Sequence, residues 1–301
     1  MIPDEDKLLA RAIKASLWVG VVLLAVKIGA AASTGSSAIY SDAAESVVNV
    51  LAALFAAYSL QLSRKPADEN HHYGHEKAAY VSAGFEGAMI AAAACFILYD
   101  AIHNLIVGAQ IKRPDLGLIL TAATAGVNAV LGIVLLRVGR RQGSVVVEAN
   151  GQHVLTDVWT SAGVIVGLVL VMWSGNPVWD PVAAIIVALN ILFTGWRIVR
   201  KSLDGLMDAA DPVLERAIRD LLEKETRARQ LDFHQLRYRH SGRTHWVEVH
   251  LTFPDDWRID QAHASATEVE AALHRMLTPH ARIITHLEPL SAVGQSEAWE
   301  A

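Results

Sequence analysis

Two apolar stretches of this sequence carry polar residues at the same spacing, three and then four residues apart: Asp42, Glu45 and Asn49, and Asn150, His153 and Asp157. Residues at this spacing lie on one face of an α-helix. Ionisable groups are costly inside a membrane, so they usually face a bundle interior or a water-filled cavity and serve a function. We therefore expect each trio to form one polar helix face.

A single ion can bind where the two polar faces meet. Two carboxylates, an amide oxygen and an imidazole are the donors offered by Glu45, Asn49, His153 and Asp157. Four such ligands suit a divalent transition metal, and imidazole favours zinc, iron, cobalt or nickel over magnesium or calcium. The alternative is that these groups only hydrogen-bond one another to fix helix packing. We favour the metal, because two carboxylate-bearing faces otherwise repel each other.

The other polar residues of the apolar stretches stand alone. For these we expect hydrogen bonding within the helix packing: Glu86, Asp100, Asn128 and Asn190. The single cysteine, Cys95, is expected to be a packing residue rather than a ligand.

A histidine-rich loop offers a second set of ligands. Within residues 66–77, Asp68, His71 and His75 present one oxygen and two nitrogen donors over a short segment. This set suits a peripheral metal site or an entry funnel for the ion. The alternative is a loop whose histidines are only solvated.

The last third of the chain holds further metal-binding residue types in different expected elements: His234, His250, His263, His286 and Glu288. Strand alternation places Glu248 and His250 on one face together with Trp246. Scattered surface histidines are common, so these five residues alone are weak support for a site.

The elements that must position the two polar trios are membrane spans. The chain has 301 residues, of which 52% are hydrophobic and 19% charged, and its mean hydropathy is +0.29. A crossing helix needs about 20 apolar residues, and six segments qualify: 12–33, 38–62, 80–107, 115–138, 146–174 and 178–199. Buried helices of a large soluble core are the alternative, but several segments have no continuous polar face to meet water.

Basic residues set the orientation of these spans. They gather around the start of the first span, between the second and third, from the end of the fourth to the fifth, and around the end of the sixth: Lys7, Arg11, Lys14, Arg64, Lys65, Lys77, Arg137, Arg140, Arg141, Arg197, Arg200 and Lys201. Lysine and arginine are enriched in cytoplasmic loops. The pattern therefore predicts six spans with both termini in the cytoplasm.

The remainder of the chain is polar and reads as a compact α+β module. Asp211 and Pro212 predict a helix start, with the aspartate as N-cap and the proline at the first helical position. That helix is followed by two alternating strands, a second helix at about 260–277 and a short third strand. We predict a transmembrane domain at 1–206, an α-β-β-α-β cytoplasmic domain at 207–292 and a tail at 293–301.

Composition excludes several classes of protein. The formal charge of −5 gives no support to nucleic-acid binding, which needs a basic face. The high apolar content excludes a disordered chain, and a single cysteine excludes a disulfide-stapled secreted domain.

These features together resemble the cation diffusion facilitator family over nearly the whole chain. Six spans, an acidic motif in the second, HxxxD in the fifth and an α-β-β-α-β tail match the family's layout. The segment KPADENHHYGHEKAA is the most specific local match. It is similar to the loop of the bacterial zinc and iron efflux subgroup, in which an aspartate and two histidines bind a peripheral metal.

The resemblance implies roles for the candidate residues. His153 and Asp157 fall on the family's HxxxD motif, whereas Glu45 and Asn49 stand where the subgroup usually has two aspartates. The tail residues match a binuclear regulatory site in a metallochaperone-like domain, with Glu288 in place of the usual aspartate. The resemblance also implies a homodimer that pairs through these tail domains.

The function implied is efflux of a divalent transition metal by metal/proton antiport with alternating access. Zn²⁺ is the first expectation, with Fe²⁺, Mn²⁺, Co²⁺, Ni²⁺ or Cd²⁺ as alternatives, and the metal acts as both substrate and regulator without an organic cofactor. The expected protein is a multi-pass secondary transporter of the inner membrane rather than an enzyme. Two other classes stay open: an intramembrane metalloenzyme, and a metal-sensing or structural membrane protein. No HExxH or Gly-x-Ser-x-Gly motif supports the enzyme.

Overall fold

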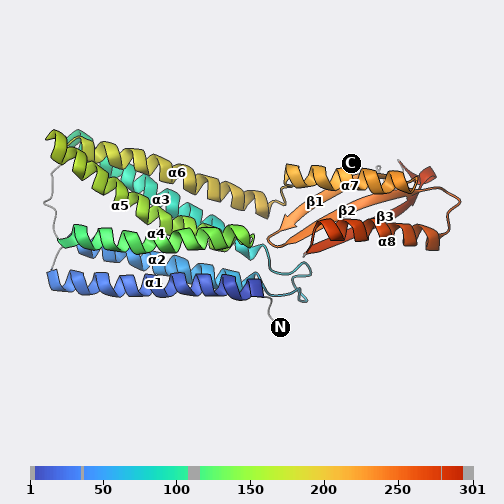
Figure 1. Cartoon of the computed structure of the whole chain (residues 1–301), viewed down its shortest axis with the longest axis horizontal. Coiled ribbons are helices and arrows are strands. Elements are labelled where there is room, and N and C mark those ends of the chain that lie inside the picture. Colours follow the sequence, from blue (N-terminus) through green and yellow to red (C-terminus); the bar gives the residue numbers. More distant parts are fainter. Residues whose placement is uncertain (1–3, 35–36, 108–115, 279, 294–301) are drawn as a thin grey trace. The chain divides into compact units, whose positions relative to one another are not determined.

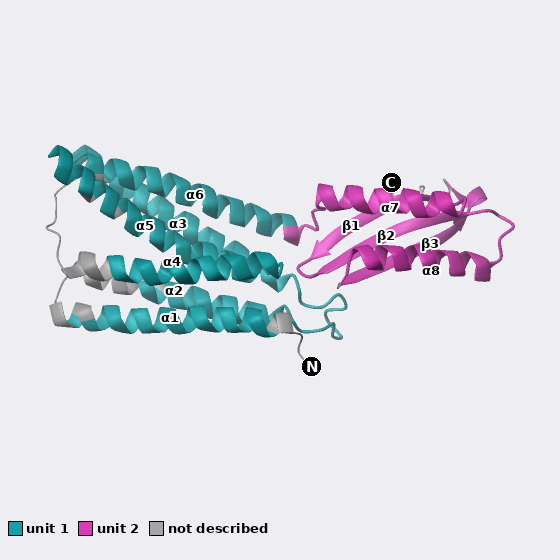
Figure 2. Ribbon diagram, viewed as in Figure 1, with its two compact units in different colours: residues 1–204 teal, residues 205–301 magenta. Residues whose placement is uncertain are grey.

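The chain folds into two compact units, residues 1–204 and residues 205–301 (Figure 2). The computed structural model describes residues 4–34, 37–107, 116–278 and 280–293. The first unit is helical, and the second combines helices with a three-stranded sheet (Figure 1). This is the architecture that the sequence predicts.

Six long helices make up the first unit: α1 (Asp4–Thr34), α2 (Ser37–Leu62), α3 (Ala78–Val107), α4 (Leu116–Arg141), α5 (Val145–Ser174) and α6 (Trp179–Leu206). Within the described residues, five of them are long and apolar enough to cross a membrane, and α2 contributes a shorter apolar stretch, Asn49–Leu62. Two ends extend furthest past the predicted spans: α1 begins at Asp4, and α6 continues to Leu206.

A small apolar core joins α1, α2, α4 and α5 near one end of the unit. It includes Leu9, Ile13, Ala56 and Leu135, all of which are buried. Many other apolar side chains point outward, and Trp173 is 86% exposed. Exposed apolar area of this extent is what helices present to lipid rather than to water.

Helices α4 and α5 pack closely because glycines remove side chains from their contact. A Cβ on Gly151 would lie 2.7 Å from the backbone nitrogen of Leu136, and one on Gly139 would lie 2.5 Å from the backbone nitrogen of Glu148. Small residues allow this approach of helix backbones in membranes. The close contact fixes the rotation of α5, and with it the face that carries His153.

The second unit contains α7 (Pro212–Ala228), β1 (Asp232–Ser241), β2 (Thr244–Phe253), α8 (Ile259–Met276), β3 (Ala281–Pro289) and the short 3₁₀ helix η1 (Leu290–Ala292). Asp211 caps α7 by accepting hydrogen bonds from the backbone of Val213 and Leu214, with Pro212 at the helix start, as predicted. The core of the unit packs α7 and α8 against one face of the sheet through Ile218 and Val269.

The sheet has the order β1-β2-β3, with β1 antiparallel and β3 parallel to β2. Alternate residues of β2, including Val247 and Val249, face the core. A β-bulge interrupts β1 between His234 and Arg237, where Gln235 has a φ of 50°. One extra residue reverses the side-chain alternation, so His234 shares the face opposite the core with residues of the other two strands.

Candidate metal centres

The first centre lies where α2 and α5 meet. His153 Nε2 is 3.0 Å from Asn49 Oδ1, and Asn49 Nδ2 donates a hydrogen bond to Asp157 Oδ2 at 2.7 Å. One turn away, Ser16 on α1 donates to Asn150 Oδ1 at 2.8 Å. The two polar helix faces expected from the sequence therefore do meet, and Asn49 bridges the histidine and the carboxylate.

This network borders a narrow cavity of about 40 Å³. A water molecule occupies about 30 Å³ in the liquid, so the space suits one small ion or water. Its lining brings together the side chains of Ser16, Lys27, Ser46, Asn49, Asn128, Asn150, His153 and Asp157. Polar residues from α1, α2, α4 and α5 thus converge on one point inside the helical unit.

The hydrogen bonds around Asn49 define what an arriving cation must change. The amide group donates to Asp157 through its nitrogen and accepts from His153 through its oxygen. A metal needs oxygen and unprotonated imidazole nitrogen as ligands. A metal bound at this point would take the Asn49 amide oxygen and an unprotonated nitrogen of His153 in place of these hydrogen bonds.

Lys27 is the residue that sequence reasoning missed. Its ammonium donates to Ser46 Oγ at 2.8 Å, and its side chain is only 8% exposed. It lines the same cavity as Asp157. A lysine inside an otherwise apolar span is unusual. Lys27 lies within the predicted span 12–33, so the sequence already contained this signal.

The remaining polar residues of the apolar stretches lie in different settings. The side chains of Asp42 and Glu45 lie outside the described residues. Asn128, for which we expected a packing role, lines the cavity. Asp100 is exposed and accepts a hydrogen bond at 2.9 Å from Asn104 of the same helix, so this bond does not join it to another helix.

The second centre is the loop between α2 and α3. Asp68 Oδ1 lies 2.9 Å from His71 Nδ1, and its other oxygen lies 3.4 Å from His75 Nε2. The backbone amides of Asn70 and His71 also donate to Asp68 Oδ1, forming a tight turn. The hydrogen bond from His71, outweighing the burial effect, lowers the pKa of Asp68. One ligand atom from each of the three predicted residues lies within 4.8 Å of the others.

The third centre is built by the register of the sheet. His234, His250 and His286 are direct partners across β1, β2 and β3. The carboxylate of Glu288, two residues along β3, lies 2.9 Å from His234 Nε2, 2.9 Å from His250 Nδ1 and 3.3 Å from His286 Nε2. Three imidazoles therefore surround one carboxylate that is only 4% exposed.

Electrostatics keep this carboxylate charged. Burial raises the pKa of Glu288. Hydrogen bonds and positive charge from His234 and His250 together lower it by more than burial raises it, so the pKa lies below its usual value. Ligand atoms of these three residues lie within 4.8 Å of one another. The fifth predicted member, His263, is an exposed residue of α8, and no contact among the described residues joins it to the cluster.

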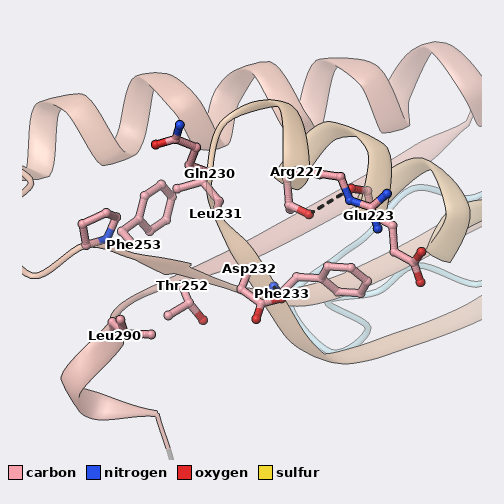
Figure 3. A pocket seen from close by; sticks show the side chains of 11 residues that line it. Glu223, Arg227, Gln230, Leu231, Asp232, Phe233, Thr252, Phe253 and Leu290 are labelled. Carbon is pink, nitrogen blue, oxygen red and sulfur yellow. Dashed lines mark hydrogen bonds between the residues drawn. The ribbon is translucent and has the colours of Figure 1, made fainter.

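A wider cavity of the second unit lies elsewhere. It has a volume of about 390 Å³ and is lined by the end of α7 and by residues of β1 and β2, including Arg227, Asp232 and Thr252 (Figure 3). Neither of the two metal-ligand clusters among the described residues contributes to its lining. The candidate chemistry of the molecule therefore lies in the three centres above rather than in this cavity.

Comparison with known proteins covers nearly the whole chain. Residues 13–207 match the cation efflux transmembrane domain, and residues 210–290 match the cytoplasmic domain of cation efflux proteins. An uncharacterized transporter of Synechocystis, sll1263, is 36% identical over 95% of this chain and 91% of its own length. The cation-efflux pump FieF of Cronobacter sakazakii is 32% identical over 96% of both chains, and that of Serratia proteamaculans is 30% identical over the full length of both.

Proposed function

Because the chain belongs to the cation efflux family, also called cation diffusion facilitators, we propose that it exports a divalent transition metal, Zn²⁺ first, in exchange for protons. Membership of the family makes the chain a multi-pass membrane transporter rather than an enzyme, which removes the intramembrane metalloenzyme from consideration. The metal, the antiport and the residues that bind the ion are the content of the proposal.

The observation that carries the proposal is the bridge made by Asn49. One side chain from α2 contacts both His153 and Asp157 of α5, at 3.0 and 2.7 Å. These three groups with Glu45 are the proposed transport ligands. The donor set contains imidazole, which favours zinc and its transition-metal neighbours over magnesium and calcium.

Proton exchange follows from the same groups. Metal ligands must be deprotonated, so an ion and protons compete for His153 and the carboxylates. In the proposed cycle the site loads the metal while open to the cytoplasm. Protons displace it when the site opens to the other side. The Asn49 amide carries no titratable proton, so we assign this exchange to His153, Asp157 and Glu45.

The two outer centres have supporting roles in this proposal. Asp68, His71 and His75 form a peripheral metal site that collects ions near the transport pathway. His234, His250, His286 and Glu288 form a regulatory site in the cytoplasmic domain, where bound metal stabilises a homodimer. We further propose that the protein lies in the inner membrane with both termini in the cytoplasm, as the distribution of lysine and arginine predicts.

The test is a panel of metals on proteoliposomes. Uptake of zinc, iron(II), manganese, cobalt, nickel and cadmium is followed together with internal pH, for wild type and Asn49→Asp. We expect zinc flux with opposed proton movement, and about tenfold tighter apparent zinc binding in the variant, because a carboxylate replaces a neutral ligand. Asn104→Asp, which adds the same charge on α3 outside the cavity, is the matched control and should leave zinc affinity unchanged.

Other outcomes have definite meanings. If another metal dominates and Asn49→Asp changes its rank, Asn49 contacts the ion but the choice of zinc is wrong. If flux proceeds without any change of internal pH, proton exchange is wrong. Flux and affinity that are identical in wild type and Asn49→Asp would remove Asn49 from the site.

A further inference from the structure

A charged cluster lies at the end of the helical unit from which the chain continues into the cytoplasmic domain. The end of α4, the start of α5 and the last turns of α6 contribute to it. One carboxylate oxygen of Glu148 accepts a hydrogen bond from Arg140 Nε at 3.2 Å, and the other accepts one from Lys201 Nζ at 2.7 Å. One carboxylate therefore holds two cations from two different helices at a fixed separation.

The cluster borders a cavity of about 170 Å³ with an excess of positive charge. Arg140, Arg197 and Lys201 line it against the single carboxylate of Glu148, which leaves a net charge of +2. Arg197 stacks over the ring of Phe193 at 5.5 Å and forms no ion pair among the described residues. Among the described residues, no carboxylate therefore pairs with its charge.

The lining also supplies hydrogen-bond donors that the protein does not use up. Arg140 contributes only its Nε to Glu148, and a guanidinium has five N–H donors. The first residue of α5, Val145, lies in the lining, so the positive end of that helix dipole adds to the field. These features fit a phosphate-bearing anion better than they fit a metal ion or a neutral solute.

The surroundings identify the source of the phosphate. Apolar side chains of Val145, Ala149 and Ile198 form part of the lining, and Phe193 and Trp196 on α6 are each 61% exposed. Exposed aromatic residues near helix ends lie at the lipid headgroup level. The cytoplasmic domain begins a few residues after α6, so the cavity is on the cytoplasmic side, where anionic lipids are found.

We propose that this cavity binds the phosphodiester headgroup of an anionic phospholipid of the cytoplasmic leaflet. The headgroup contacts Arg197, Lys201 and Arg140, and so links α6 to α4 and α5. The site is separate from the three metal centres, and its occupancy is independent of which ion the protein carries.

The experiment measures lipid binding to the purified, delipidated full-length protein in a neutral detergent. Short-chain phosphatidylglycerol, short-chain phosphatidylcholine and inorganic phosphate are titrated separately, with binding followed by native mass spectrometry. We expect phosphatidylglycerol alone to bind, and Arg197→Gln to weaken it about fivefold, which corresponds to about 1 kcal/mol for one basic residue. Arg200→Gln, three residues later on α6 and outside the lining, should bind the lipid like wild type. Arg197→Lys should restore most of the binding, since it keeps the charge.

Three results overturn the proposal. Equal weakening by Arg197→Gln and Arg200→Gln would show general attraction of the lipid to a basic surface. Displacement of phosphatidylglycerol by an equal concentration of inorganic phosphate would assign the site to the free anion. Equal binding of phosphatidylcholine would show that the net charge of the lipid does not matter. Thermal unfolding in the same detergent checks that the Arg197 variants fold.

Discussion

The intramembrane centre and the cytoplasmic centre use similar ligand types in opposite arrangements. In the cytoplasmic domain a buried carboxylate, Glu288, lies among three histidines that the strand register places side by side. In the helical unit a neutral amide, Asn49, separates one histidine from one carboxylate, and the ammonium of Lys27 lines the same small cavity.

The difference matches what each proposed role requires. A regulatory site needs to hold its metal, and an anionic group surrounded by imidazoles favours retention. A transport site must release its ion. The neutral ligand Asn49 and the nearby ammonium of Lys27 both weaken the binding of a metal ion in a low-dielectric cavity. The proposed division of labour can be tested by removing the central group of each site in turn.

The largest effect is expected for Asp157→Ala. This change leaves the ion without a carboxylate that lies in the cavity, and truncating one partner of a buried charge pair costs about 3–5 kcal/mol, or about 100-fold or more in affinity. Metal flux into proteoliposomes should fall to background, while size-exclusion and circular dichroism show a folded protein.

Asp100→Ala is the matched control for this change. Asp100 is an exposed carboxylate of α3 whose side chain accepts a hydrogen bond from nearby Asn104 and does not line the cavity, so flux should be retained. Normal flux in purified Asp157→Ala would show that the intramembrane centre is not the transport site.

A smaller and different effect is expected for His250→Ala combined with His286→Ala. Loss of two of the three imidazoles should weaken metal binding by the cytoplasmic domain by about 10–100-fold. Because this metal is not transported, the metal concentration that gives half-maximal flux should shift more than the maximal rate does. Calorimetry and flux titrations measure the two quantities, and complete loss of flux with intact folding would instead indicate a direct role in transport.

The smallest effect concerns pH and Glu288 in the metal-free protein. The pKa of this carboxyl is lowered in the folded state by His234 and His250 despite burial. A lowered pKa adds stability that is complete above the unfolded value and is lost as pH falls through the folded value. Hydrogen exchange of β3 should therefore be slower in wild type than in Glu288→Gln near neutral pH, with the gap closing in acid. A gap that does not close in acid would contradict the assignment.

The sequence allowed prediction of the local features of both centres. Helical spacing placed Asn49 on one face of its span and His153 with Asp157 on one face of another, because the helix repeat depends only on neighbouring residues. Strand alternation placed His250 away from the core for the same reason. The order of helices and strands, including the start of α7 at Pro212, is also confirmed.

Contacts between distant segments were beyond the reach of these local rules. Lys27 was passed over, and Asn128 was assigned to packing, because nothing in their own segments shows that α1 and α4 border the same cavity as α5. The bulge at Gln235 was equally hidden, although it decides that His234 shares a face with His250.

The sequence by itself therefore determined the elements, the membrane spans and the types of ligand available. Hydrophobic length, residue type and periodicity are properties of single segments, and they need no partner to be recognised. Only the tertiary structure decided that Asn49 lies between His153 and Asp157, and that Glu288 lies among three histidines. Those distances depend on how α2 packs against α5 and on how the strands align, which are set by packing between residues far apart in the chain.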